Sequence, residues 1–278
     1  MTIQQKFRPA AIEANLNFLE PMSERPVTWQ YDPPPGVPVR NFDYAPQRAI
    51  VRDGRPFTDR FTLDGEGFAL LRAPGTFTLF DEEAAIRSHY YREVERLLAA
   101  ATGAAAIAFD HNVRSNARIA AGEAGIRPPV DRAHNDFTAL SGHKRVRREL
   151  AAQGLDPSIV DGRRHAIVNL WRPIGRIVEK SPLALCDASS LSDGDLIASD
   201  LIYRDRMGEI YNLVFNPAQR WYYFPHMSPD EAILIKGFDS LEIVARFAPH
   251  TAFDDPFSPP DAPERESIET RALLIYPA

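Results

Sequence analysis

"HAIVNLWRPIGRIVEKSPLALCDASSLSDGDLIASDLIY", residues 165 to 203, contains three short apolar runs separated by turn residues. Five further runs follow, namely "IYNLVFNP", "RWYYFPHM", "EAILIKGFDS", "IVARFAPHTAF" and "SIETRALLIYP". Short runs rich in β-branched and aromatic residues, bounded by Gly, Pro, Asp and Ser, indicate β-strands. Eight such strands in succession predict a β-sandwich or a jelly roll.

The half of the chain before these strands supplies the helices. Residues 81–102 carry apolar side chains every three or four positions behind an acidic first turn, which predicts an amphipathic helix. Residues 140–154 predict a second helix that ends at Gly154. Between them, "AAAIAFDHNVRS" at 104–115 is interpreted as a strand that runs into a polar loop. The expected class is therefore α+β or mainly β, with helices beside a β core.

The first 80 residues form a proline-rich N-terminal extension or lid in this interpretation. "DPPPGVPVRNFDYAPQ" at 32–47 is too stiff and too poor in N–H donors for a helix or a central strand. We expect the segment to wrap the surface or to reach over a site. The length of 278 residues fits one large core, so residues 1–278 are predicted to form a single domain.

Composition excludes several classes of protein. With 44% hydrophobic and 25% charged residues the chain has the balance of a globular protein. The net charge of −6, without a basic block longer than "HKRVRRE" at 143–149, argues against nucleic-acid partners. Residues 1–19 lack an apolar stretch followed by a cleavage site, and no run is long enough for a membrane helix, so we expect a cytoplasmic protein. The single cysteine, Cys186, leaves His, Asp and Glu as ligands for any metal.

"RAHNDFT" at 132–138 is the candidate for a metal site. Residues two apart on a strand face the same side, so His134 and Asp136 can bind one cation. They would fill two positions of a 2-His-1-carboxylate triad, which holds Fe(II) and leaves open positions. A bare His-x-Asp pair is more often made of ordinary turn residues. A metal site of this kind therefore also requires a second histidine from elsewhere in the chain as the third ligand. His250 is preferred over His226, because it ends an apolar strand while His226 precedes the turn "SPDE".

"RESIETR" at 265–271 is the candidate for binding a carboxylate. Arg265, Ser267 and Arg271 alternate along one predicted strand and can therefore face one cavity. An arginine fork with a neighbouring hydroxyl suits the distal carboxylate of a 2-oxo acid. The alternative for this segment alone is an exposed strand face that forms surface ion pairs.

Several longer motifs together resemble the CmcJ/AsaB-type family of non-haem Fe(II)/2-oxoglutarate-dependent oxygenases, which includes gibberellin desaturase-like enzymes. They are "FDHNVR", "HNDFT", "VNLWRPI", "SPLALCDASSL", "YNLVFNPAQRWYYFPHMSPDEAILIKGFDS", "PHTAFDDP" and "RESIETRAL". The resemblance covers residues 105–278 and implies that this part is a catalytic core. It also implies that this core is a double-stranded β-helix, the jelly-roll or cupin-like fold.

The resemblance assigns roles by position. It implies that His134, Asp136 and His250 are the iron ligands, and that Arg265, Ser267 and Arg271 hold 2-oxoglutarate. It leaves open which of the two arginines makes the main contact.

Two further residues near these motifs draw attention. Arg172 in "LWRPI" is a further candidate for the cavity. Asn135 is polar where the family is expected to carry an apolar or aromatic residue, which suggests a different substrate or a water near the iron.

The implied function is the hydroxylation or desaturation of a small specialised metabolite by dioxygen, with decarboxylation of 2-oxoglutarate to succinate. A homodimer is compatible with these features. Three alternatives stay open at this point: a non-catalytic or differently metallated jelly-roll binding protein, an iron oxygenase that does not use 2-oxoglutarate, and a zinc hydrolase.

Overall fold

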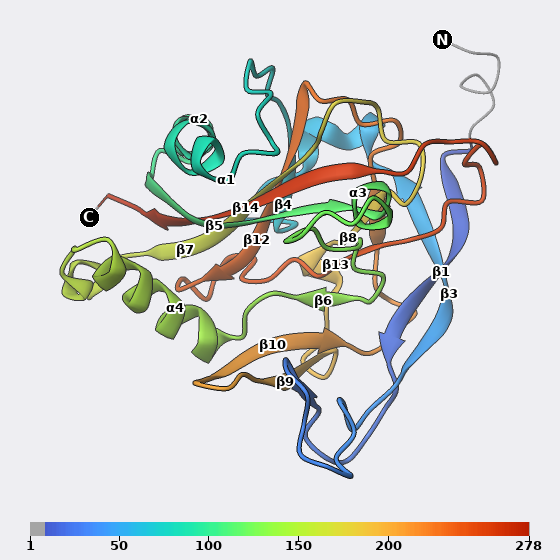
Figure 1. Cartoon of the computed structure of the whole chain (residues 1–278), viewed down its shortest axis with the longest axis horizontal. Coiled ribbons are helices and arrows are strands. Elements are labelled where there is room, and N and C mark those ends of the chain that lie inside the picture. The colour runs from blue at the N-terminus through green and yellow to red at the C-terminus, as the bar shows by residue number, and fades with distance from the viewer. Residues whose placement is uncertain (1–8, 278) are drawn as a thin grey trace.

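Two β-sheets make up the body of the computed structural model, which describes residues 9 to 277 (Figure 1). The larger has nine strands in the order β1-β3-β11-β8-β13-β6-β10-β9-β2, and the smaller has five in the order β4-β12-β7-β14-β5. The strands are β1 (Ala11–Leu19), β2 (Val27–Trp29), β3 (Tyr44–Asp53), β4 (Phe68–Arg72), β5 (Ala105–Ser115), β6 (His134–Asn135), β7 (His165–Pro173), β8 (Leu183–Cys186), β9 (Leu196–Ile202), β10 (Met207–Leu213), β11 (Trp221–Tyr223), β12 (Glu231–Asp239), β13 (His250–Ala252) and β14 (Glu266–Ile275).

Eight of these strands build a jelly roll. Along the chain, β5, β7, β12 and β14 fall in the smaller sheet, while β6, β8, β11 and β13 fall in the larger one. Apolar side chains from both sheets meet between them, as Phe68 and Ile233 of the smaller sheet do with Leu185 of the larger. The predicted jelly-roll core is confirmed, and strands added at the sheet edges extend it.

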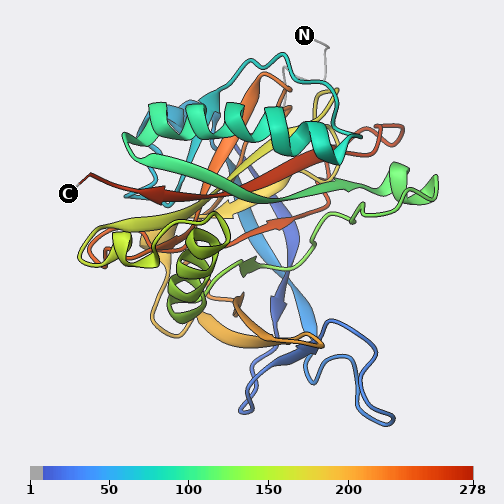
Figure 2. The same ribbon diagram turned by 60° about the vertical axis from the view of Figure 1, so that its left-hand side comes forward.

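The helices cover the smaller sheet and one end of the molecule. They are α1 (Glu83–Ala85), α2 (Tyr91–Thr102), α3 (Asn116–Ala120) and α4 (Ala139–Ala152), and a π-helical turn over Ile86–Tyr90 joins α1 to α2. Figure 2 shows α2 along the outer face of β5 and β14, where Val94 and Leu98 pack on Leu274. Helix α4 packs on a separate apolar cluster through Val146 and Leu150. Both predicted helices are present.

The N-terminal segment differs from its prediction, because it contributes strands to the larger sheet. Strand β3 pairs with β1 along its whole length and with β11 only from Val51 to Asp53. Pro46 therefore lies where β3 has one neighbour, a place that tolerates a missing N–H donor. The first eight residues of the predicted extension, and of the stretch used to argue for the cytoplasm, lie outside the described residues. Within residues 9–277, no helix is long and apolar enough to cross a membrane.

Two other predicted boundaries are wrong. Strand β5 continues to Ser115 instead of giving way to a polar loop at 110–115, because these residues pair with β14 along their length. The apolar run that begins at residue 243 forms a strand only over His250–Ala252. The polar side chains at 110–115 caused the incorrect prediction of a loop. They are polar because alternate residues at this end of β5 lie on the same side of the sheet as the polar residues of β14.

Candidate active site

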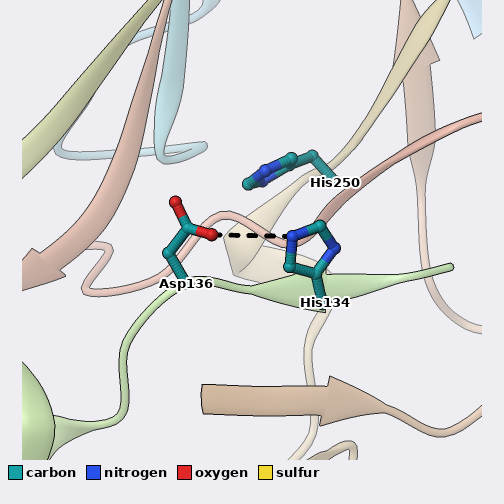
Figure 3. Close-up of side chains that lie close together, drawn as sticks. All are labelled: His134, Asp136 and His250. Atoms are coloured by element: carbon teal, nitrogen blue, oxygen red, sulfur yellow. Dashed lines mark ion pairs between the residues drawn. The ribbon is translucent and has the colours of Figure 1, made fainter. Parts of the chain in front are cut away.

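The sheet brings the two predicted histidine ligands together. His134 of β6 pairs directly with His250 of β13 in the antiparallel register, so their side chains lie on the same face. Their ring centroids are 4.7 Å apart, and Figure 3 shows both rings beside Asp136. One ligand atom from each of the three side chains lies within 4.8 Å of the others. His226, the rejected candidate, is in a turn with a positive φ of 53° and is not part of this cluster.

Asn135, between the first two ligands, points to the opposite face. Its amide nitrogen donates to the carbonyl oxygens of Phe137 (2.7 Å) and Gly237 (2.8 Å), and its Oδ1 accepts from the N–H of Ala248 (3.2 Å). The side chain is fully buried. Its polarity is thus explained by three backbone partners, which corrects the interpretation of Asn135 as a sign of a different substrate or a nearby water.

Backbone carbonyls set the orientation of both imidazoles. Nδ1 of His134 lies 2.9 Å from the carbonyl oxygen of Arg132, and Nδ1 of His250 lies 3.1 Å from that of Ala248. A carbonyl can only accept, so each Nδ1 carries the proton and each Nε2 keeps a lone pair for a metal. Burial lowers the pKa of His134, which favours the neutral, ligating form.

Asp136 faces the histidines with one oxygen and cationic or amide donors with the other. Oδ1 lies 3.6 Å from Nε2 of His134. Oδ2 accepts from Nδ2 of Asn169 (2.8 Å) and Nε of Arg271 (2.9 Å). Burial opposes ionisation, but the charge of Arg271 outweighs it and holds the pKa of the Asp136 carboxyl well below its usual range. An ionised carboxylate with two neutral imidazoles is a donor set that fits Fe(II).

Arg265, which directly precedes β14, and Ser267 of β14 have buried polar atoms without a partner among the described residues. Arg265 is 3% exposed, and one of its terminal nitrogens donates to the carbonyl oxygen of Ser181. Its Nε and the Oγ of Ser267 are buried without a partner among the described residues, and the guanidinium lies over the ring of Trp171 at 5.3 Å. Burial, followed by the charge of Arg114, lowers the pKa of Arg265 to about 9. A buried guanidinium without an acid is costly and fits a ligand carboxylate.

Arg271, predicted to hold the co-substrate, is placed differently. Its Nε contacts Asp136, its NH1 lies 3.4 Å from Asp110, and its NH2 lies 3.3 Å from Glu269. All three nitrogens therefore already face carboxylates of the protein. The structure brings Arg271 to the proposed metal ligands, while Arg265 and Ser267 present unpartnered donors.

The remaining candidate, Arg172, faces away from the site. It donates to Glu93 of α2 and to the carbonyl oxygens of Ala73 and Pro229. The period of two along β7 explains this, because Asn169 faces the site and Arg172 falls on the other side. The prediction that Arg172 belongs to the cavity is wrong.

Sequence reasoning missed Glu269 and Arg114. Glu269 continues the alternation of Arg265, Ser267 and Arg271, so the same period of two would have placed it on this face. Arg114 lies opposite Ser267 only through the pairing of β5 with β14. No pattern in the sequence gives that register.

Comparisons with known proteins agree with this geometry. A family model described as an oxidoreductase/YMDC permease-like domain matches residues 16–275. The hydroxylase/desaturase efuI of Hormonema carpetanum is 31% identical, over 84% of this chain and 85% of that protein. The Fe(II)/2-oxoglutarate-dependent dioxygenase nvfI of Aspergillus novofumigatus is 29% identical, over 95% and 96%. A solved structure of NvfI, described as an iron and alpha-ketoglutarate-dependent endoperoxidase, superimposes with a TM-score of 0.87 at 26% identity, over 98% of this chain and 100% of that one.

The jelly roll, the histidine and aspartate cluster and these relatives define a non-haem Fe(II)/2-oxoglutarate-dependent oxygenase. The chain belongs to the AsaB-type family of these enzymes. It is an oxidoreductase whose cofactor and co-substrates are Fe(II), 2-oxoglutarate and dioxygen.

Proposed function

We propose that His134, Asp136 and His250 hold the iron, and that Arg265 with Ser267 binds the distal carboxylate of 2-oxoglutarate. When bound, the iron supplies the activation of dioxygen that couples decarboxylation of 2-oxoglutarate to succinate with oxidation of the substrate. Two observations carry the proposal: the cluster of His134, Asp136 and His250, and the buried Nε of Arg265, which has no partner among the described residues.

The protein's own residues have separate tasks in this proposal. Nε2 of His134 and of His250 ligate because backbone carbonyls hold the protons on Nδ1. Arg265 and the Ser267 hydroxyl donate to the two oxygens of one carboxylate, which fixes the 2-oxo acid end toward the cluster. The ring of Trp171 shields the guanidinium from water and strengthens that contact.

We propose that the substrate is a small specialised metabolite and that the outcome is hydroxylation or desaturation. The name of efuI supports these two outcomes, while NvfI is described as an endoperoxidase. Succinate release in the presence of candidate metabolites, followed by mass spectrometry of the product, distinguishes the outcomes. A gain of 16 mass units marks hydroxylation, and a loss of two marks desaturation. If every substrate that is coupled to succinate release shows some other mass change, the proposed outcomes are refuted.

We further propose that residues 1–278 act as one catalytic domain in the cytoplasm, without a nucleic-acid partner. The family model spans residues 16–275, and the net charge of −6 opposes binding to phosphate backbones. Cell fractionation and a gel-shift assay with mixed nucleic acid test these points.

The decisive experiment is an anaerobic titration of the apo-protein with Fe(II) and 2-oxoglutarate, followed through the weak visible charge-transfer band of the chelate. His134→Ala and His250→Ala should lose the band, and His226→Ala is the matched control that should keep it. Absence of the band in the wild type would refute the assignment of the site.

Arg265→Gln separates the co-substrate contact from the metal site. It should weaken 2-oxoglutarate binding roughly 10- to 100-fold, the range expected for a hydrogen bond to a charged group. It should leave unchanged the binding of 2-oxopentanoate, which lacks the distal carboxylate. Equal weakening of both acids would show that Arg265 does not recognise that carboxylate.

A further inference from the structure

The two oxygens of Asp136 are in different environments. Oδ2 is occupied by two donors, Nδ2 of Asn169 and Nε of Arg271, at 2.8 and 2.9 Å. Oδ1 has no such donor among residues 9–277 and lies 3.6 Å from Nε2 of His134. The side chain therefore directs Oδ1 toward the two imidazoles, while Oδ2 stays hydrogen-bonded to Asn169 and Arg271.

Arg271 and Asn169 are themselves held in place. They are direct partners across β14 and β7, and Asp110 is the partner of Arg271 across β14 and β5. Nδ2 of Asn169 also donates to Glu269 at 2.6 Å, and Arg271 reaches Glu269 at 3.3 Å and Asp110 at 3.4 Å. Three adjacent strands thus fix both donors, so Oδ2 cannot turn toward a metal without leaving these hydrogen bonds.

Movement of Oδ2 would be costly. Arg271 is 9% exposed and Asn169 is fully buried, so a donor that lost Asp136 would lack water as a replacement. A hydrogen bond to an ionised group is stronger than one between neutral groups, and Oδ2 accepts two hydrogen bonds, one of them from a guanidinium.

We propose that Arg271 and Asn169 are positioning residues that keep Asp136 monodentate, with Oδ1 as its only metal-binding oxygen. A carboxylate that bound through both oxygens would take a coordination position that a chelating co-substrate and dioxygen require. The inference rests on the proposed metal site and assigns to Arg271 a task in place of the predicted contact with the co-substrate.

The test uses Mn(II), which prefers octahedral coordination by oxygen and nitrogen ligands and whose bound waters are counted by water-proton relaxation. With a monodentate Asp136 the ion keeps about three waters, and with a bidentate Asp136 it keeps about two. Arg271→Gln and Asn169→Ala should therefore lower the relaxation per bound ion by roughly one third. Both should also weaken Mn(II) binding roughly 10- to 100-fold, as expected when a residue that orients a ligand is removed.

Two further variants separate positioning from folding. Arg271→Lys keeps the charge but not the fork, so it should restore part of the affinity lost in Arg271→Gln. Arg145→Gln is the matched control, because Arg145 lies 3.7 Å from Asp110 and makes no ion pair with Asp136. It should keep the relaxation and the affinity of the wild type. Circular dichroism and thermal unfolding identify any variant that does not fold.

Each outcome decides the question. Folded Arg271→Gln and Asn169→Ala variants with wild-type relaxation per bound ion would overturn the inference, even if their melting temperatures fall. If the relaxation per bound ion falls in only one of these two variants, the inference that Arg271 and Asn169 act together would be overturned. A wild-type protein that binds neither Mn(II) nor Fe(II) would instead refute the proposed metal site.

Discussion

Replacement of Asn135 by alanine should destabilise the protein and weaken the site at the same time. Asn135 holds three buried backbone groups, on Phe137, Gly237 and Ala248. Ala248 also offers the carbonyl that orients His250. Loss of this side chain therefore leaves three polar groups without partners and loosens the segment that positions a ligand.

The magnitude follows from the number of hydrogen bonds. Each contributes a net of about 0.5–1.5 kcal/mol, and an unsatisfied buried partner costs more. We expect Asn135→Ala to lower the free energy of unfolding by about 3–5 kcal/mol. With an unfolding entropy of about 2.1 cal/mol/K per residue, the melting temperature of this 278-residue chain should fall by roughly 5–9 °C.

Thermal unfolding followed by circular dichroism measures the loss, with Asn15→Ala on the exposed face of β1 as the matched control. Asn135→Asp adds a sharper test, because it keeps the acceptor for Ala248 but turns an oxygen toward the carbonyls of Phe137 and Gly237. It should destabilise at least as much as alanine. A loss below about 1 kcal/mol in both Asn135 variants, together with unchanged Fe(II) affinity, would refute this reasoning, because three hydrogen bonds at the lowest contribution of about 0.5 kcal/mol each already amount to about 1.5 kcal/mol.

Three more results are expected. Gly142→Ala should destabilise by about 1–3 kcal/mol despite the better helix propensity of alanine, because an added Cβ would clash with the ring of Phe238. A rise in melting temperature would contradict this. Cys186 should resist alkylation at pH 8 until the protein unfolds, because the thiol is fully buried and burial raises its pKa, and mass spectrometry of the treated native protein checks this. Arg114→Gln should weaken 2-oxoglutarate binding roughly tenfold in the charge-transfer titration. Arg114 and Arg265 are buried cations that repel each other, and one ligand carboxylate can relieve this repulsion. Wild-type affinity for 2-oxoglutarate in the variant would exclude Arg114 from that contact.

The sequence alone determined the architecture and the candidates for the site. Alternation of short apolar runs and turn residues after residue 165 predicts strands, and period-two spacing predicts that His134 shares a side with Asp136, and Arg265 with Ser267. These are local properties of the backbone, so one chain segment is enough to predict them. The same period explains Glu269, which was missed although it lies in the same alternation.

Tertiary structure decided what each polar residue faces. Arg265 directly precedes β14, and its Nε has no partner among the described residues, while Arg271, six positions further along, meets Asp136. Two of the three partners of Asn135, Gly237 on β12 and Ala248 ahead of β13, lie more than 100 positions away along the chain. Register between distant strands is fixed by packing of the whole core, and this is why the sequence could propose candidate residues for the site but not their partners.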